Sequence, residues 1–412
     1  MMSRIALRCE GCENPFTARI GAAPTDLTRF YLLCPICGLP IRGRATGQEL
    51  KEFKIEFEDA ERMDAEIPRA PVVTVDPSVP AKRDADSDSG LGSFTMQTFL
   101  ILLGDGLSDY FSDAGTAVDA ATERWTGVRR IWTYYLDKSW ILFDKAGKST
   151  FPDWVVASTD LDRTRSAYRA LEAITSRIVG TRAIGSTIFL DRYRRKDEAA
   201  IRVGSYGDLL RQDVADGRTQ TLERDLFALV DTFARNYDIW ALGRLPRHLP
   251  DSRKSSIIEL TLFRDDFSQL RDLYQQGFEL VCKSTRFVVA AQNTVKRGDP
   301  NDFGTGVPAS LNAKQPPATL KAFDKLPNAS RLAYVSAVPG WEGLTNLLNN
   351  RTRNAIGHAT AHHDLRSGKI VSDIDPAGTP YLDFVGYVFD VFDAVAAAVQ
   401  VLRTARVNAL LD

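Results

Sequence analysis

The stretch DDFSQLRDLYQQGFELVCKSTRFVVAAQ, Asp265 to Gln292, decides the fold of the larger part of this chain. Its apolar residues recur three and four positions apart, which predicts a long amphipathic helix. The stretch LERDLFALVDTFARNYDIWAL, Leu222 to Leu242, shows the same spacing. The chain from Phe94 to Asp412 is therefore predicted to be mainly helical.

The last helical stretch, YLDFVGYVFDVFDAVAAAVQVLRTARVNALL, begins at Tyr381 and carries one apolar stripe. This pattern predicts a core helix in preference to a dimer-forming one. The stripe consists of Leu382, Val385, Phe389, Phe392, Val395, Val399 and Leu402. Two prolines between Leu245 and Asp251 break the helical pattern, so we expect a middle helical domain over 94–250 and a C-terminal one over 251–412.

The composition is that of a soluble globular protein. The chain has 412 residues, of which 44% are hydrophobic and 25% charged, and its formal net charge is −1. This charge excludes a global attraction to nucleic acid or membranes, so any polyanion site must be local. The apolar run Phe94 to Leu103 is too short to cross a bilayer, and no leader opens the chain. We therefore expect a cytoplasmic protein with no membrane partner.

The first residues contain two cysteine pairs, CEGC and CPIC, in a C-x2-C-x21-C-x2-C pattern. Two such pairs supply the four thiolates that zinc needs in a tetrahedron. We therefore predict a zinc ribbon over 1–57 that holds one structural zinc ion per chain, with Gly11 and Gly38 in its tight turns. The predicted ligands are Cys9, Cys12, Cys34 and Cys37.

The composition changes after the predicted ribbon. The stretch Ala65 to Ser93 is rich in Pro, Ala, Asp, Ser and Gly, which predicts a flexible linker over 58–93. The ribbon itself has several arginines and few acids, which predicts a local basic patch that favours nucleic-acid binding. These arginines are Arg4, Arg8, Arg19, Arg29, Arg42 and Arg44.

The stretch NNRTRNAIGHATAHHD, Asn349 to Asp364, contains three of the four histidines in the chain. We expect a helix from Trp341 to Gly357, with His358 at or just beyond its end. On that helix Arg351, Asn354 and His358 share one stripe, whereas Arg353 lies about 140° from His358.

Three interpretations of this segment are open. The first is a solvated helix end without chemistry. The second is a metal site formed by His358 and His362 with His363 or Asp364. The third is a site that cleaves RNA, in which histidine moves protons during attack by the 2′-OH and arginine stabilises the charged phosphorane. The third needs neither a metal nor a cofactor for catalysis.

The sequence RNAIGH, Arg353 to His358, resembles the R-x4-6-H signature of HEPN-domain ribonucleases, in which a polar residue follows the arginine. The segment lies on a helix that precedes a short excursion containing SGKIV and then the long apolar terminal helix. This is the order found in HEPN domains of bacterial phage-defence and toxin proteins. The resemblance covers roughly 267–412 and implies a helical bundle whose catalytic residues are Arg353, Asn354 and His358. Arg351 stands within the permitted spacing as well.

The resemblance implies a metal-independent endoribonuclease that acts as a homodimer, with RNA as its substrate. We expect an abortive-infection or toxin effector directed against phage, whose zinc ribbon binds a phage or cellular trigger. His362 and His363 are outside the signature; we expect solvated loop residues in preference to phosphate or RNA contacts. The alternative is a non-catalytic scaffold that dimerises through its helical domain and binds nucleic acid or protein through the ribbon. A metallohydrolase that uses the histidine cluster is a third hypothesis.

Overall fold

The computed structural model describes residues 2–21, 25–47, 54–64, 68–82, 94–182, 188–311, 313–357 and 360–411. The chain forms two compact units, each built from three separate stretches. Unit 1 comprises Met1–Phe111, Asp238–Arg271 and Asn354–Gly386; unit 2 comprises Ser112–Tyr237, Asp272–Arg353 and Tyr387–Asp412. This division differs from the four consecutive segments predicted as domains, 1–57, 58–93, 94–250 and 251–412, because distant parts of the chain return to the same unit.

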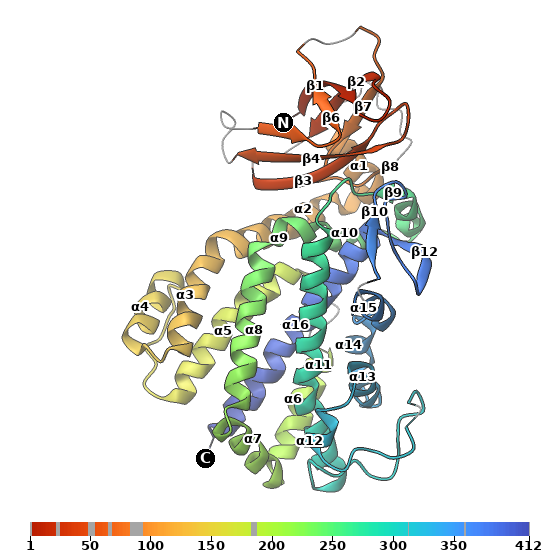
Figure 1. Cartoon of the computed structure of the whole chain (residues 1–412). Helices are drawn as coiled ribbons and strands as arrows, with labels where there is room; N and C mark the ends of the chain where they lie inside the picture. The colour runs from red at the N-terminus through yellow and green to blue at the C-terminus, as the bar shows by residue number, and fades with distance from the viewer. Residues whose placement is uncertain are drawn as a thin grey trace. The chain divides into compact units, whose positions relative to one another are not determined.

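Unit 1 contains the small β-sheets of the molecule. The first has the strand order β6-β1-β2-β7, in which β7 is parallel to β2 and the other pairs are antiparallel. Its strands are β1 (Met2–Cys9), β2 (Pro15–Gly21), β6 (Ala60–Arg62) and β7 (Val72–Val75). The second is the antiparallel sheet of β3 (Thr25–Leu33), β4 (Pro40–Gly47) and β5 (Lys54–Phe57). Figure 1 shows β3 and β4 side by side.

Two further sheets of unit 1 come from later in the chain. The strands β10 (His362–Asp364), β11 (Lys369–Ser372) and β12 (Asp375–Pro380) form an antiparallel meander, which confirms the predicted extended excursion before the last helix. The short strands β8 (Ala81–Lys82) and β9 (Leu260–Thr261) pair with one another.

The hydrophobic core of unit 1 joins the N-terminal strands to residues far along the chain. Alternate residues of β1 and β2 point inward, as expected for strands with one buried face. Phe263 and Leu365 belong to the same buried cluster, and the backbone N–H of Tyr31 donates a hydrogen bond to the carbonyl of Phe263 over 3.2 Å. The predicted ribbon is thus packed against later segments of the chain and is not an independent module.

The prediction of a flexible linker over 58–93 is wrong for the residues that the structure describes there. β6 pairs with β1, β7 pairs with β2, and β8 pairs with β9. The run VVTV of β7 is β-branched throughout, and residues of this kind favour a strand wherever a sheet offers a free edge. Prolines and small residues surround this four-residue β-branched run, so the composition of the segment indicated a linker. Residues 65–67 and 83–93 of the predicted linker lie outside the described part of the chain.

Unit 1 also contains short helices. They are α1 (Phe94–Leu103), η1 (Gly104–Gly106), most of α9 (Tyr237–Trp240), η3 (Ala241–Arg244), α10 (Leu245–His248) and η4 (Asp251–Glu259), together with the start of α2 (Leu107–Asp119). The predicted break at Leu245 to Asp251 is present, because Pro246 occupies the first turn of α10 and the helix stops before Pro250.

Unit 2 is helical. A π-helical turn, η2 (Ala120–Arg124), continues α2 into α3 (Trp125–Leu136). The following helices are α4 (Trp140–Thr150), α5 (Asp160–Val179), α6 (Ile188–Ile201), α7 (Ser205–Ala215), α8 (Arg218–Arg235), α11 (Phe267–Arg297), α12 (Leu320–Phe323), α13 (Asn328–Ser336), α14 (Glu342–Asn346), α15 (Asn350–Gly357) and α16 (Tyr381–Ala409). Three of these, α11, α15 and α16, have residues in both units.

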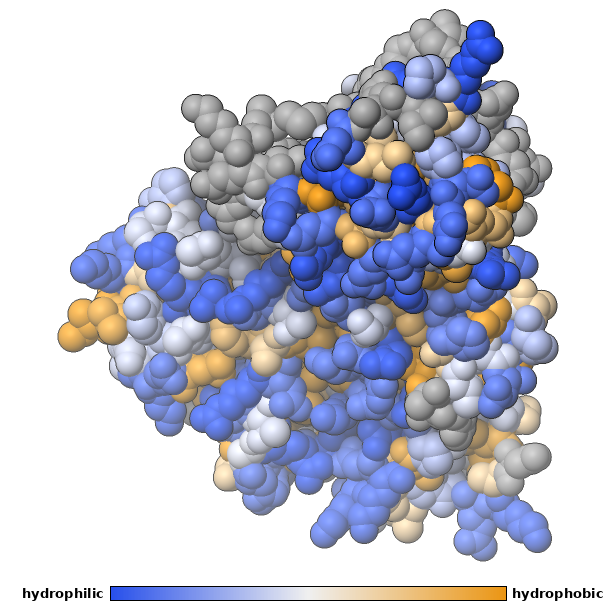
Figure 2. Space-filling view, turned by 45° about the horizontal axis from the view of Figure 1, so that its top comes forward, coloured by the Kyte–Doolittle hydropathy of each residue, from blue (hydrophilic) through white to orange (hydrophobic). Residues whose placement is uncertain are grey.

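Aromatic side chains join the helices of unit 2. Figure 1 shows α3, α5 and α8 running alongside one another. Trp132 of α3 is fully buried, and its ring lies 5.1 Å from that of Tyr168 and 5.8 Å from that of Phe227. Its indole N–H donates to the carbonyl of Ala167 over 2.9 Å, so the buried polar group is satisfied. In the face drawn in Figure 2, hydrophilic residues cover most of the described surface.

The predicted core role of the terminal helix is confirmed. Every residue of its apolar stripe is at most 2% exposed. α16 is the one helix among the described residues that is long and apolar enough to cross a membrane, but 78% of its most apolar window is buried inside the molecule. Such burial is what a core helix shows. The prediction of a mainly helical chain after Phe94 is confirmed by the helices of unit 2.

Two helical glycines of unit 2 give a matched test of packing. A Cβ atom at Gly147 would lie 2.0 Å from the Trp154 ring, whereas one at Gly115 would meet nothing within 4 Å. We expect Gly147→Ala to destabilise the protein by about 1–2 kcal/mol, since overpacking outweighs the gain in helix propensity. Gly115→Ala should stabilise it by about 0.5–1 kcal/mol. Urea unfolding of both variants measures the difference, and equal effects would contradict this packing.

The buried carboxyl group of Asp197 should make the stability of unit 2 depend on pH. Burial raises its pKa from 3.8 to about 6, against the lowering effect of a hydrogen bond from Tyr206. The folded state therefore holds the proton that the unfolded state releases, and the free energy of unfolding falls by about 2 kcal/mol as the pH rises from about 4 to 6. We expect Asp197→Asn to remove this dependence. Denaturant unfolding at pH 4 and pH 7 measures the free energy of unfolding of both proteins. If the difference between the two pH values is the same in Asp197→Asn as in the unaltered protein, the prediction is wrong.

Candidate functional site

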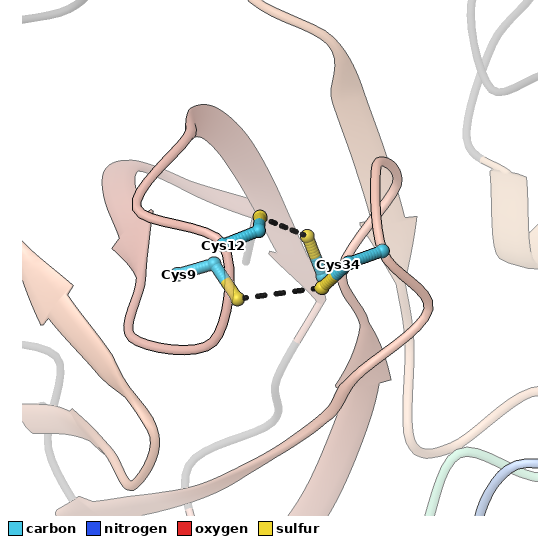
Figure 3. A group of neighbouring side chains, drawn as sticks. Cys9, Cys12 and Cys34 are labelled. Carbon is cyan, nitrogen blue, oxygen red and sulfur yellow. Dashed lines mark hydrogen bonds between the residues drawn. The ribbon is translucent and has the colours of Figure 1, made fainter.

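The four predicted zinc ligands lie together at one end of the strands of unit 1. Their Sγ atoms are all within 4.8 Å of one another. The Sγ atoms of Cys9 and Cys37 are 3.8 Å apart, and so are those of Cys12 and Cys34. A tetrahedral zinc ion with Zn–S bonds of about 2.3 Å holds its sulfurs about 3.8 Å apart. Figure 3 shows the thiols of the labelled cysteines pointing toward one another. The cluster could therefore bind one zinc ion.

The two cysteine turns have the same backbone geometry. The N–H of Glu13 donates to the carbonyl of Cys9 over 2.8 Å, and the N–H of Gly38 donates to that of Cys34 over 2.9 Å. Glu13 and Gly38, each directly after the second cysteine, have left-handed φ angles of 58° and 72°. Gly38 thus has the predicted turn role. Gly11 lies close to a neighbouring side chain, since a Cβ there would lie 2.9 Å from Cδ2 of Leu39.

The protonation of the thiols links metal binding to pH. Burial raises the pKa of Cys34 to about 12 and also raises the pKa of Cys9. Hydrogen bonding to the Asn14 backbone lowers the pKa of Cys12 to about 7. Zinc binds thiolates, so binding must release protons, and affinity should fall as the pH falls. Four thiolates leave no open coordination position, which fits a structural zinc ion.

Four of the six arginines in the predicted basic patch have an acidic neighbour within 4 Å. Nε of Arg42 lies 2.9 Å from Asp265, and Nη2 of Arg44 lies 2.5 Å from Glu56. Weaker pairs join Arg8 to Glu61 at 3.8 Å and Arg29 to Asp266 at 3.9 Å. Asp265 and Asp266 come from a distant stretch of the chain, which sequence inspection could not place here. The patch is therefore a mixed-charge surface.

The helix that carries the candidate catalytic residues starts later than predicted. The expected helix from Trp341 to Gly357 is divided into α14 and α15 at Asn349. The side-chain oxygen of Asn349 accepts a hydrogen bond from the N–H of Thr352 over 3.0 Å. The backbone carbonyl of Asn349 accepts one from the hydroxyl of Tyr274 over 2.7 Å. Asn349 therefore begins a new helix by satisfying one of its first N–H groups. The described part of α15 reaches Gly357, as predicted.

The structure places the two candidate arginines differently. Arg351 is exposed on α15. The side chain of Arg353 is 28% exposed, and its Nη2 atom lies 3.6 Å from Oε1 of Glu279 on α11. Asn354 is half-buried, on the stripe of the helix that also carries Arg351. His358 lies outside the described residues, so its predicted position just beyond the helix stays a prediction.

The two later histidines have different environments. His362 is exposed on β10. The side chain of His363 is only 3% exposed, and its ring stacks on that of Tyr381 at a centroid distance of 4.3 Å and an angle of 8°. The ring of Tyr31 lies edge-on to the His363 ring, at a centroid distance of 5.6 Å. The expectation of a solvated loop is therefore wrong for His363, because the returning β10 strand places it in the core of unit 1.

The histidine metal site has no support among the described residues. His362 and His363 are adjacent on a strand, so their side chains point to opposite faces. The carboxylate of Asp364 instead accepts hydrogen bonds from the N–H groups of Arg366 and Ser367, at 3.1 and 3.2 Å. Within the described part of the chain, the cysteine cluster is the group that could hold a metal ion.

Sequence inspection missed Glu279 and Tyr274, the residues of α11 that contact the candidate segment. They lie within the helical pattern of Asp265 to Gln292, where nothing marks them as partners of a segment some 70 positions later. Comparisons of the chain with family models, with curated proteins and with solved structures found no match.

Proposed function

We propose that this protein is a metal-independent endoribonuclease of HEPN type, with zinc in a structural role only. The observation that carries the proposal is that exposed Arg351 and half-buried Asn354 share one stripe of α15, and His358 comes four positions after Asn354 in the sequence. The β10–β12 meander and the buried helix α16 follow in the order expected from the resemblance.

These residue types can carry out transesterification of RNA. A base takes the proton from the 2′-OH, and the 2′ oxygen forms a bond to phosphorus as the bond to the 5′ oxygen breaks. The departing oxygen takes a proton, and the products are a 2′,3′-cyclic phosphate and a 5′-hydroxyl. His358 is suited to the proton transfers because its ordinary pKa is near neutrality. The amide of Asn354 can hydrogen-bond the phosphate or the sugar.

We assign the phosphate contact to Arg351 and a positioning role to Arg353. Arg351 is exposed, so its guanidinium can meet a phosphate without first being uncovered. Arg353 is largely covered and is held by Glu279, which orients α15 against α11. This assignment goes beyond the signature alone, which allows either arginine. A homodimer would bring two copies of the segment to one cleft.

The cellular role that fits this activity is a cytoplasmic toxin or abortive-infection effector against phage, with a trigger bound through the cysteine module. The test is induction of the chain in a bacterial host, with total RNA examined on a gel. Growth arrest with discrete RNA fragments supports the proposal if both are lost in Arg351→Ala and His358→Ala. Intact RNA both with and without phage infection, at equal expression, would refute it.

A non-catalytic scaffold is the second candidate function. The Arg353–Glu279 ion pair favours it, since this arginine has a structural partner without any substrate. In that case α15 only packs against α11, and the mixed-charge surface of unit 1 binds a protein or nucleic-acid partner. Arg351→Ala and His358→Ala would then leave both growth and partner capture unchanged.

A further inference from the structure

Unit 2 contains a cavity of about 540 Å³, a size typical of small-molecule sites. Its wall is formed by the start of α8, the middle of α11, the end of α12 and the start of α13. Charged and polar side chains dominate this wall. They include Arg218, Arg286, Arg331, Asp324, Asp225 and Glu279.

Three guanidinium groups converge on one side of the cavity, which we call the arginine wall. Arg218 and Arg286 both donate to Oδ2 of Asp324, over 2.7 and 2.5 Å. Arg331 donates to the backbone carbonyl of Asp324 and, over 3.0 Å, to that of Leu326. The backbone carbonyls orient Arg331 without cancelling its charge. The wall is therefore fixed in place before any ligand arrives.

The charge of the arginine wall does not balance. Arg286, whose side chain is 6% exposed, forms a two-pronged contact with Asp213 over 2.9 and 3.2 Å. Asp213 also lies 3.3 Å from Nε of Arg218. Two carboxylates, those of Asp213 and Asp324, contact these three guanidiniums, and a third carboxylate, that of Asp216, also lines the cavity. The guanidiniums of the wall therefore outnumber the carboxylates that contact them. An oriented arginine cluster of this kind suits the oxygens of a phosphate group.

The rim of the cavity has a different chemistry. Lys283 lies 3.3 Å from Asp225, and their side chains are 51% and 44% exposed. Glu279 also lines the cavity and is 40% exposed. Exposed carboxylates accept hydrogen bonds from hydroxyl groups, whereas they would repel a bare anion. Arginines within and carboxylates at the rim therefore fit a molecule with a phosphate at one end and hydroxyls at the other.

We propose that this cavity binds a phosphorylated small molecule with a hydroxylated body. Its phosphate lies against the arginine wall, and its hydroxyl groups bond to Asp225 and Glu279. A free sugar phosphate and a nucleoside monophosphate share this chemistry. The proposal does not depend on RNA cleavage, because none of its contacts uses Arg351 or His358; Glu279 of the rim also pairs with Arg353.

Isothermal titration calorimetry of the zinc-loaded full chain tests this site with inorganic phosphate, ribose 5-phosphate and adenosine 5′-monophosphate. We expect at least one organic phosphate to bind at micromolar concentrations, and inorganic phosphate to bind at least about tenfold more weakly, since it lacks the hydroxyl contacts. The organic phosphate that binds with higher affinity shows whether the cavity takes a free sugar phosphate or a nucleoside monophosphate. Absence of binding by all three at millimolar concentration would overturn the proposal, and equal binding of all three would overturn the role of the rim.

Arg218→Gln should weaken organic phosphate binding by about 10- to 100-fold, because it removes a charged hydrogen-bond donor. Arg211→Gln is the matched control, since Arg211 pairs with Asp208 over 2.8 Å outside the cavity. If Arg218→Gln fails to fold, Arg331→Gln, which alters the same arginine wall, supplies the same comparison. Equal affinity in the wall and control variants would contradict the site. Arg351→Ala should bind the ligand as the unaltered chain does.

Discussion

Replacing Cys34 by serine is expected to abolish zinc binding and to unfold the cysteine-bearing strands of unit 1. Cys34 is 2% exposed and belongs to the same buried cluster as Phe30 and Phe263, so its loss removes a metal ligand from inside a core. Structural zinc ions supply about 10–16 kcal/mol of folding free energy, which is comparable with or above the whole stability of a domain, about 5–15 kcal/mol. We therefore expect unit 1 to lose its protection from proteolysis.

The measurement combines zinc analysis with limited proteolysis. The control is Cys282→Ser, because Cys282 is equally buried but lies in α11 of unit 2, outside the cluster. This control should retain one zinc per chain and the wild-type cleavage pattern in unit 1. A Cys34→Ser variant that binds one zinc ion, or keeps the same protection without it, would show that the cluster has no structural role.

The second large effect is expected at the proposed catalytic residues. His358→Ala should slow RNA cleavage by about 100- to 10,000-fold, the usual contribution of general acid-base catalysis. Arg351→Ala should slow it by about 100- to 1,000-fold, since it removes the cation that stabilises the phosphorane. Rates measured on purified proteins with equal zinc content give both numbers.

Two controls separate catalysis from folding in this experiment. His362→Ala replaces an exposed histidine on β10 and should leave the rate unchanged. Arg353→Ala removes the partner of Glu279, so it should lower the melting temperature as well as the rate. Loss of activity with Arg353→Ala at unchanged stability, together with full activity of Arg351→Ala, would reverse the roles given to the two arginines.

Local patterns in the sequence predicted local features well. The C-x2-C pairs predicted the four cysteines that meet in unit 1, because each turn fixes its own pair of thiols and the spacing lets the two turns face one another. Helical periodicity predicted α8, α11 and α16, since each has a wide apolar stripe that the fold buries. The break at Pro246 and Pro250 follows from proline geometry alone.

The errors arose where distant segments meet. The strand β7 forms because β2 offers it an edge, and that edge exists only in the folded chain. Asp265 neutralises Arg42, and the ring of Tyr31 lies edge-on to that of His363, through contacts that span hundreds of positions in sequence. Composition and residue spacing do not predict such long-range contacts. The same holds for Glu279, whose ion pair with Arg353 no local pattern in the sequence indicates.

The most direct measurement of the central claim is cleavage of a short RNA by the purified zinc-loaded protein, with analysis of the product ends. The prediction is a 2′,3′-cyclic phosphate and a 5′-hydroxyl, with no cleavage of the same RNA carrying a 2′-deoxy group at the cut position and none by His358→Ala. RNA that stays intact with the folded protein in the presence of phage lysate, or cleavage that survives His358→Ala, would contradict it.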